Sequence, residues 1–69
     1  MGKKKVKTSN EQIRETIRRY ELTRQQAADL LGVSLHTIHN WLRPESNVAF
    51  RKAPPYAAEL LALKARDAG

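Results

Sequence analysis

A single glycine separates two helix-like stretches in the middle of the chain, in the segment Leu22 to Leu42, LTRQQAADLLGVSLHTIHNWL. Gly32 stands where a glycine ends a helix in the left-handed conformation, because it has no Cβ atom to clash there. Ser34 follows two residues later, and serine is a preferred N-cap residue. The sequence therefore predicts one helix that ends at Gly32 and a second that begins after Ser34, joined by the three-residue turn GVS.

The helix before Gly32 also has a start signal. Thr23 and Gln26 have the spacing of a capping box, in which two residues satisfy free backbone amides of the first turn. We expect the small Ala28 to let the two helices approach closely and Val33 to pack into the core beneath the turn. Both features favour a compact pair of helices.

The helix after Ser34 has two different sides. Ile38 and Trp41 recur at helical spacing and predict a core-facing side, with Trp41 in the core rather than stacked on a base, and Pro44 ends the helix. The other sides carry side chains that form hydrogen bonds and include no carboxylate: His36, Thr37, His39, Asn40 and Arg43. An ordinary helical hairpin would explain Gly32 but not this choice of polar residues.

Two more helices are expected on either side of this pair. The first begins after Ser9, with Gln12 completing a capping box, and runs to about Tyr20 with Ile13 and Ile17 toward the core. The last spans residues 55–66, because Pro54 and Pro55 suit a helix entrance. We therefore expect an all-α fold: a small four-helix domain over residues 9–69.

The segment between the third and fourth helices, PESNVAFRKAP, predicts no helix. Val48 and Phe50 alternate with polar neighbours, which suits an extended loop or a short hairpin-like wing. The last helix has a broad apolar face that is too apolar for a lone surface helix. That face contains Tyr56, Ala57, Leu60, Leu61 and Leu63.

The charge of the chain favours a polyanionic partner. Thirteen lysines and arginines against seven acidic residues give a formal charge of +6 on 69 residues, which creates a positive field around so small a body. A generically soluble basic domain is the alternative. Residues 1–8 include four lysines, so we expect a flexible basic tail that either follows a phosphate backbone or only aids solubility. The absence of cysteine and of an apolar span favours a cytoplasmic protein, in a bacterial host, without a membrane partner.

The helix pair resembles the phage repressor and Cro-like DNA-binding domains over about residues 11–66. The resemblance depends on the spacing of a small residue, a glycine and a β-branched residue, which Ala28, Gly32 and Ile38 provide. It implies a helix-turn-helix whose second helix enters the DNA major groove. The segment FRKAPPYAAELLAL, around Arg51 to Tyr56, is similar to the end of the anti-CRISPR-associated (Aca) autorepressors. That similarity implies a homodimer that binds an inverted repeat and silences its own operon.

These positions predict three groups of site residues. Base-reading residues on the first turns of the reading helix are Leu35, His36, His39 and Asn40. Phosphate-binding residues are Thr23, Arg24, Gln25, Ser34, Thr37, Arg43, Arg51 and Lys52. Residues of a homodimer interface are Tyr56, Leu60, Leu61 and Leu63, with Val48 or Phe50 at its margin. The alternative for the last helix is that it only covers the core of its own subunit.

Other functions predict different features. An excisionase-type protein that bends DNA would use the segment SNVAFRK as a wing, and an antitoxin-like module would grip another protein with the last helix. We expect no enzyme activity, because the sequence shows no nucleophile–base pair, paired carboxylates or glycine-rich phosphate loop. His36 and His39 have no supporting Cys, Asp or third His nearby, so we expect no metal site, and neither a cofactor nor a small-molecule effector is indicated.

Overall fold

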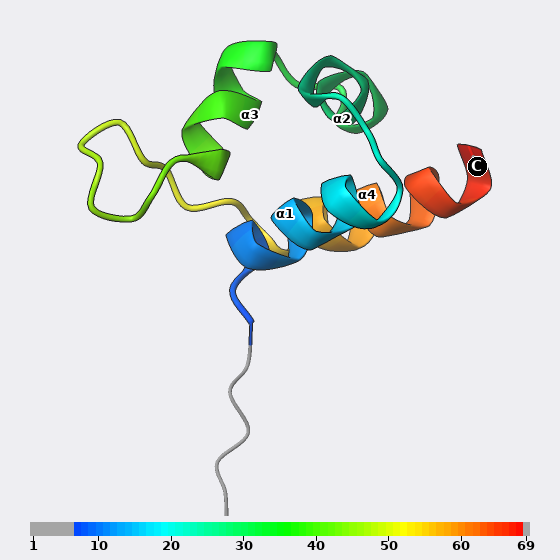
Figure 1. Cartoon of the computed structure of the whole chain (residues 1–69), viewed down its shortest axis with the longest axis horizontal. Coiled ribbons are helices and arrows are strands. Elements are labelled where there is room, and N and C mark those ends of the chain that lie inside the picture. The colour runs from blue at the N-terminus through cyan, green and yellow to red at the C-terminus, as the bar shows by residue number, and fades with distance from the viewer. Residues whose placement is uncertain (1–6, 69) are drawn as a thin grey trace, which may run out of the picture.

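The fold is all-helical over the part of the chain that the computed structural model describes, residues 7–68 (Figure 1). The helices are α1 (Ser9–Arg19), α2 (Arg24–Leu31), α3 (Leu35–Leu42) and α4 (Pro55–Ala68). Within residues 7–68 there are four helices and no strand, so the predicted small all-α fold is confirmed. No helix in this range is long and apolar enough to span a bilayer.

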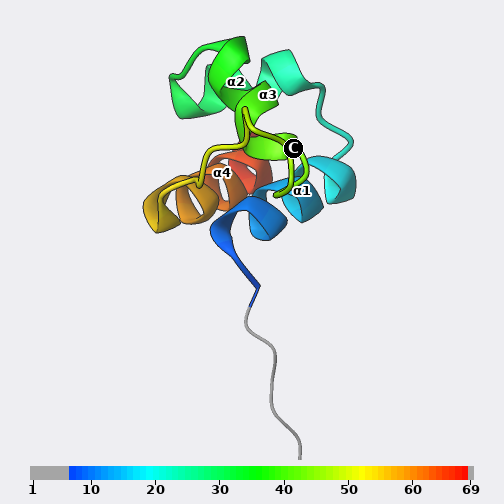
Figure 2. The same cartoon turned by 90° about the vertical axis from the view of Figure 1, so that its left-hand side faces the viewer.

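The helices are arranged in two layers. α1 and α4 lie side by side in one layer, and α2 and α3 lie across one side of them in both views (Figures 1 and 2). The most extensive contacts are between α1 and α4, with α2 packed against both α3 and α4. This arrangement places α3 at the edge of the molecule, where one of its sides faces the core and the other faces solvent.

The core contains few large side chains. Ile13 of α1, Ile38 of α3 and Leu61 of α4 are fully buried, and Trp41 is 8% exposed. Burying a side chain of this size contributes about 1.5–3 kcal/mol. The remaining buried apolar residues are alanines, which let the helices approach closely: Ala27, Ala28, Ala53, Ala57, Ala58 and Ala65. The expected core positions of Ala28, Ile38 and Trp41 are confirmed.

The start of α1 differs from the prediction by one residue. Thr8, not Ser9, is the N-cap: its Oγ1 accepts from the Glu11 amide at 3.2 Å, and Glu11 Oε1 accepts from the Thr8 amide at 3.0 Å. The predicted Ser9–Gln12 box is therefore wrong. The sequence TSNEQ fits a capping box in either register, and the structure uses the one that has Glu11 at the third helical position. Residues 1–6 of the predicted tail lie outside the described residues.

The turn between α2 and α3 forms as predicted. Thr23 and Gln26 make both hydrogen bonds of a capping box, and Gly32 ends α2 in the left-handed conformation with φ of +72°. The Val33 amide donates to the Ala28 carbonyl at 3.0 Å, the long backbone hydrogen bond of a Schellman motif. Ser34 then caps α3 by accepting from the Thr37 amide at 3.1 Å.

The segment between α3 and α4 is a loop of consecutive turns. The Asn47 amide donates to the Pro44 carbonyl at 2.9 Å, and the Phe50 amide donates to the Asn47 carbonyl at 3.0 Å. A loop is therefore confirmed. The alternative of a hairpin-like wing is wrong, because a wing needs paired strands and residues 44–54 contain none. α4 ends at Ala68, two residues beyond the predicted end at residue 66.

Candidate nucleic-acid interface

The outer side of α3 carries the predicted base-reading residues, and it is accessible to solvent in the structure. His36 is exposed, and Leu35 is 36% exposed at the first position of the helix. His39 and Asn40 are half-buried near the end of α3 that meets the following loop. The four predicted base-reading residues therefore lie on one helix whose inner side is held by Ile38 and Trp41.

His39 is oriented by a residue from another helix. Nη1 of Arg24, the first residue of α2, lies 2.8 Å from Nδ1 of His39. A guanidinium only donates hydrogen bonds, so Nδ1 is the acceptor and the neutral imidazole carries its proton on Nε2. The contact thus leaves Nε2–H as a hydrogen-bond donor and links a predicted phosphate-binding residue to a predicted base-reading residue.

Asn40 is oriented in a similar way. The Nε atom of Arg43 donates to Asn40 Oδ1 at 3.3 Å, which identifies the oxygen side of the amide. An amide oxygen has two lone pairs and the NH₂ group has two donors. Asn40 therefore retains one acceptor and both donors, the combination that pairs with the N6 and N7 edge of adenine.

Four more of the predicted phosphate-binding residues lie at two helix starts. Thr23 and Gln25 lie beside Arg24 at the start of α2; Thr23 is occupied by its capping box, and Gln25 Nε2 donates to Asp29 Oδ1 at 2.9 Å. Ser34 and Thr37 lie at the start of α3, with their hydroxyl oxygens 3.0 Å apart. The free amides of these helix starts are suitable partners for anions.

Arg51 and Lys52 lie beyond the end of α3 and are both exposed. The Arg51 amide donates to the Asn40 carbonyl at 3.2 Å, so its backbone borders the last turn of α3. Its guanidinium donates to the carbonyls of Val48 and Phe50 at 3.2 and 2.8 Å. The Arg51 side chain is therefore partly engaged by its own loop, whereas Lys52 is not placed against α3 by any contact.

Asn10 is a structural residue that the sequence did not reveal. It is 4% exposed, and its Nδ2 donates to the carbonyls of Trp41 and Arg51 at 2.9 and 3.0 Å, while its Oδ1 accepts from the Ala53 amide at 3.1 Å. It thus fixes the end of α3 and the following loop to α1. In sequence, an asparagine in a first helical turn looks like an ordinary surface residue, so no signal distinguished it.

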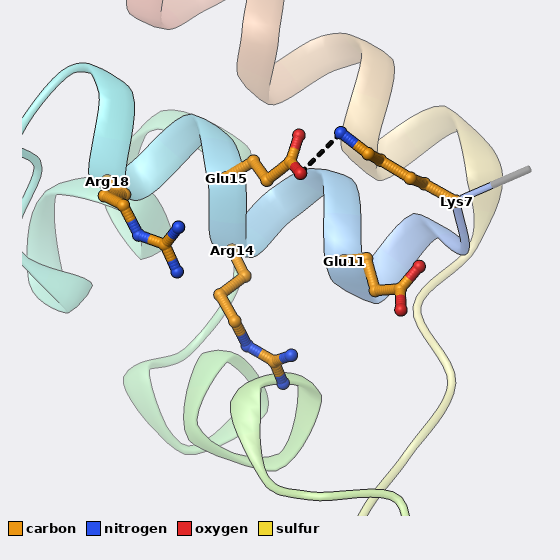
Figure 3. Close-up of a pocket in the computed structure, with 5 residues that line it drawn as sticks. All are labelled: Lys7, Glu11, Arg14, Glu15 and Arg18. Carbon is orange, nitrogen blue, oxygen red and sulfur yellow. Dashed lines mark ion pairs between the residues drawn. The ribbon is translucent and has the colours of Figure 1, made fainter. Parts of the chain in front are cut away.

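Arg14 also holds α3 from α1. Its Nη2 donates to the Leu42 carbonyl at 3.1 Å, which places a positive charge at the C-terminal end of α3, where the helix dipole favours cations. In Figure 3, Arg14 reaches from α1 toward the ribbon of α3, while the Glu15 carboxylate is turned toward Lys7. The orientation of α3 therefore depends on two α1 side chains, Asn10 and Arg14.

The predicted dimer residues do not all lie on one surface. Leu61 is fully buried in the core of its own subunit, so its assignment to a dimer interface is wrong. It follows Ala57 and Ala58 on the inner side of α4, because these positions lie one helical turn apart. On the outer side, Tyr56 is 70% exposed and Leu63 is 49% exposed, and both border a shallow hollow with Glu59 and Leu60.

Comparisons of the chain with models of known protein families, with curated proteins and with solved structures found no match. Within residues 7–68, no group of three or more His, Cys, Asp or Glu side chains is placed to hold a metal ion.

Proposed function

We propose that this protein is a sequence-specific double-stranded DNA-binding regulator of transcription. In this proposal α2, the turn at Gly32 and α3 form a helix-turn-helix, and the outer side of α3 enters the major groove. The observation that carries the proposal is the surface of α3: a capped helix without a carboxylate, whose polar residues are oriented by arginines on both sides.

The electrostatics of this surface favour DNA over a neutral partner. Arg24 donates to His39, and Arg43 donates to Asn40, so both cations are held by neutral groups and keep their full charge. Neither forms an ion pair within residues 7–68. Cations placed beside groups that read base edges match the division of DNA interfaces into phosphate contacts that position the protein and base contacts that specify sequence.

We further propose that the protein acts as a homodimer on an inverted repeat. A single reading helix contacts few base pairs, and a two-fold dimer presents two reading helices to half-sites about 34–36 Å apart. The outer side of α4 supports this assembly, because Tyr56 and Leu63 are large apolar side chains left exposed there, with Leu60 between them. The C-terminal resemblance to the Aca autorepressors makes the DNA upstream of the protein's own reading frame the proposed operator.

A DNase footprint on that upstream DNA tests the proposal. The expected result is a protected inverted repeat whose half-sites lie about one helical turn apart. Protection of direct repeats would instead favour the excisionase-type protein, although residues 45–49 form turns and residues 44–54 contain no strand. No protection at any protein concentration, together with co-purification of an unrelated chain, would contradict DNA binding and favour the antitoxin-like module.

A further inference from the structure

Arginines from α1, from α2 and from the C-cap of α3 converge beside the reading helix. Two adjoining hollows share Arg24 and Leu42 in their walls. The first, of about 230 Å³, is also lined by His39, Arg43 and Pro44. The second, of about 250 Å³, is also lined by Arg14, Ile17 and Arg18. Four guanidinium groups and one imidazole thus border these two adjoining hollows, and no carboxylate lines either hollow.

None of these four arginines forms an ion pair within residues 7–68. Within residues 7–68 the one ion pair is between Lys7 and Glu15. The other carboxylate on this part of α1, Glu11, accepts the amide of Thr8. Both acids border a separate hollow on α1 that also includes Arg14 and Arg18 (Figure 3). Glu11 and Glu15 therefore have other partners, and neither forms an ion pair with Arg14 or Arg18.

Three of the four arginines are also held in place. Arg14 donates to the Leu42 carbonyl, Arg24 to His39 Nδ1 and Arg43 to Asn40 Oδ1. These acceptors are neutral, so they restrain the side chains without neutralising them. Like charges gathered along one surface repel one another, and a bound anion would relieve that repulsion. A guanidinium presents a planar set of donors that matches the oxygens of a phosphate.

We propose that this cluster is a phosphate-binding site, and that it takes one phosphodiester of the DNA backbone flanking the reading helix. The inference deepens the proposed function and rests on it for the identity of the ligand. Its new element is Arg18 of α1, which is exposed and lines the second hollow. A helix outside the α2–α3 pair would thereby contribute to DNA binding through the backbone, without reading sequence.

Arg18 has a matched control in its neighbour. Arg19 lies on the same helix and is exposed, but its guanidinium is over the ring of Tyr20, 5.8 Å from the centroid, and it lines neither hollow. Arg18→Gln and Arg19→Gln remove the same charge from adjacent positions. A difference in DNA binding between the two variants therefore reflects the position of Arg18 at the site and not the loss of one positive charge.

Binding to a short duplex of mixed sequence, followed by fluorescence anisotropy over a series of salt concentrations, tests the site. Arg18→Gln should weaken binding and reduce the slope of log Kobs against log salt by about 0.9, the value expected for one lost phosphate contact. Arg19→Gln should leave the slope unchanged. Equal losses in the two variants, or an unchanged slope in Arg18→Gln, would overturn the inference and leave the proposed DNA binding standing.

Titration of the unmodified protein with inorganic phosphate separates the two proposals. The Nε–Hε signals of Arg18 and Arg24 should shift and saturate in NMR spectra, while that of Arg19 should not move. If the duplex does not bind but these signals saturate, the proposed function fails and the phosphate site remains. If the signals of Arg18 and Arg24 do not move, or if Arg19 moves equally, the site is refuted.

Discussion

α3 and α4 each bury one side in the same core, but their outer sides differ in chemistry. α3 buries Ile38 and Trp41 and presents polar, carboxylate-free side chains to solvent. α4 buries Ala57 and Leu61 and leaves Tyr56 exposed. The inner sides explain how the fold is held together. In the proposed function, the outer side of α3 contacts base edges and phosphates, and the outer side of α4 contacts a second protein chain.

The largest effect is expected from a substitution on the inner side of α4. Leu61→Ala should lower the free energy of unfolding by about 2–5 kcal/mol, because it leaves a cavity among residues that cannot fully close it. In a domain of this size that loss approaches the whole stability. Urea denaturation measures the effect, with Lys64→Ala as the control, since Lys64 is exposed and does not border the hollow on α4. Equal losses for the two variants would show that the sides of α4 are wrongly assigned.

The outer side of α3 is tested by Asn40→Ala. The variant should lose about 1–3 kcal/mol of binding to the cognate operator, the contribution of a good bidentate contact to an adenine, and much less on mixed-sequence DNA. The ratio of the two affinities, measured by gel shift at one salt concentration, removes any general effect on folding. Losses of the same size on both DNAs would show that Asn40 does not read a base.

The outer side of α4 is tested by Leu63→Asp. A charge in an apolar contact should raise the dissociation constant of the dimer by about tenfold or more, equivalent to about 1.4 kcal/mol, which sedimentation velocity detects. Ala62→Asp is the control: Ala62 is an exposed neighbour that does not border the hollow on α4. A dimer that both substitutions leave intact would place the interface elsewhere.

The smallest effects are expected at the two residues with positive φ, Gly32 in the α2–α3 turn and Glu21 after α1. Gly32→Ala should cost about 1 kcal/mol, because φ of +72° strains any residue with a Cβ atom, although a Cβ built there meets no atom within 4 Å. Glu21, at the end of α1, has φ of 52°. Glu21→Gly should therefore raise the stability by about 0.5 kcal/mol. Thermal denaturation measures the stability of both variants. A Gly32→Ala protein that is more stable than the unmodified protein would contradict the claim that positive φ strains a residue with a Cβ atom.

The sequence predicted the α2–α3 turn well because its signals are local. The Thr23 capping box, Gly32 and Ser34 each act within four residues, so no knowledge of the remaining chain was needed. The same local signal failed at α1, where Thr8 and Ser9 both satisfy the pattern. The pattern alone does not decide between them, and the structure uses Thr8, with Glu11 at the third helical position.

The features that the sequence could not predict depend on contacts between distant residues. Asn10 binds the backbone of residues more than thirty positions away, and the Arg24–His39 contact joins two helices. In α4, residues 60, 61 and 63 are all leucines, so residue type does not distinguish them. Only the packing of α4 against α1 and α2 determines that Leu61 is buried in the core. Helical periodicity predicted an apolar face but did not divide it between core and surface.

An NMR titration of the ¹⁵N-labelled protein with its operator duplex tests the central claim most directly. The account predicts that the largest amide shifts occur along α3 and at the first residues of α2, with small shifts on the outer side of α4. Shifts concentrated on α4, with α3 unaffected, would contradict the assignment of α3 as the helix that enters the DNA groove.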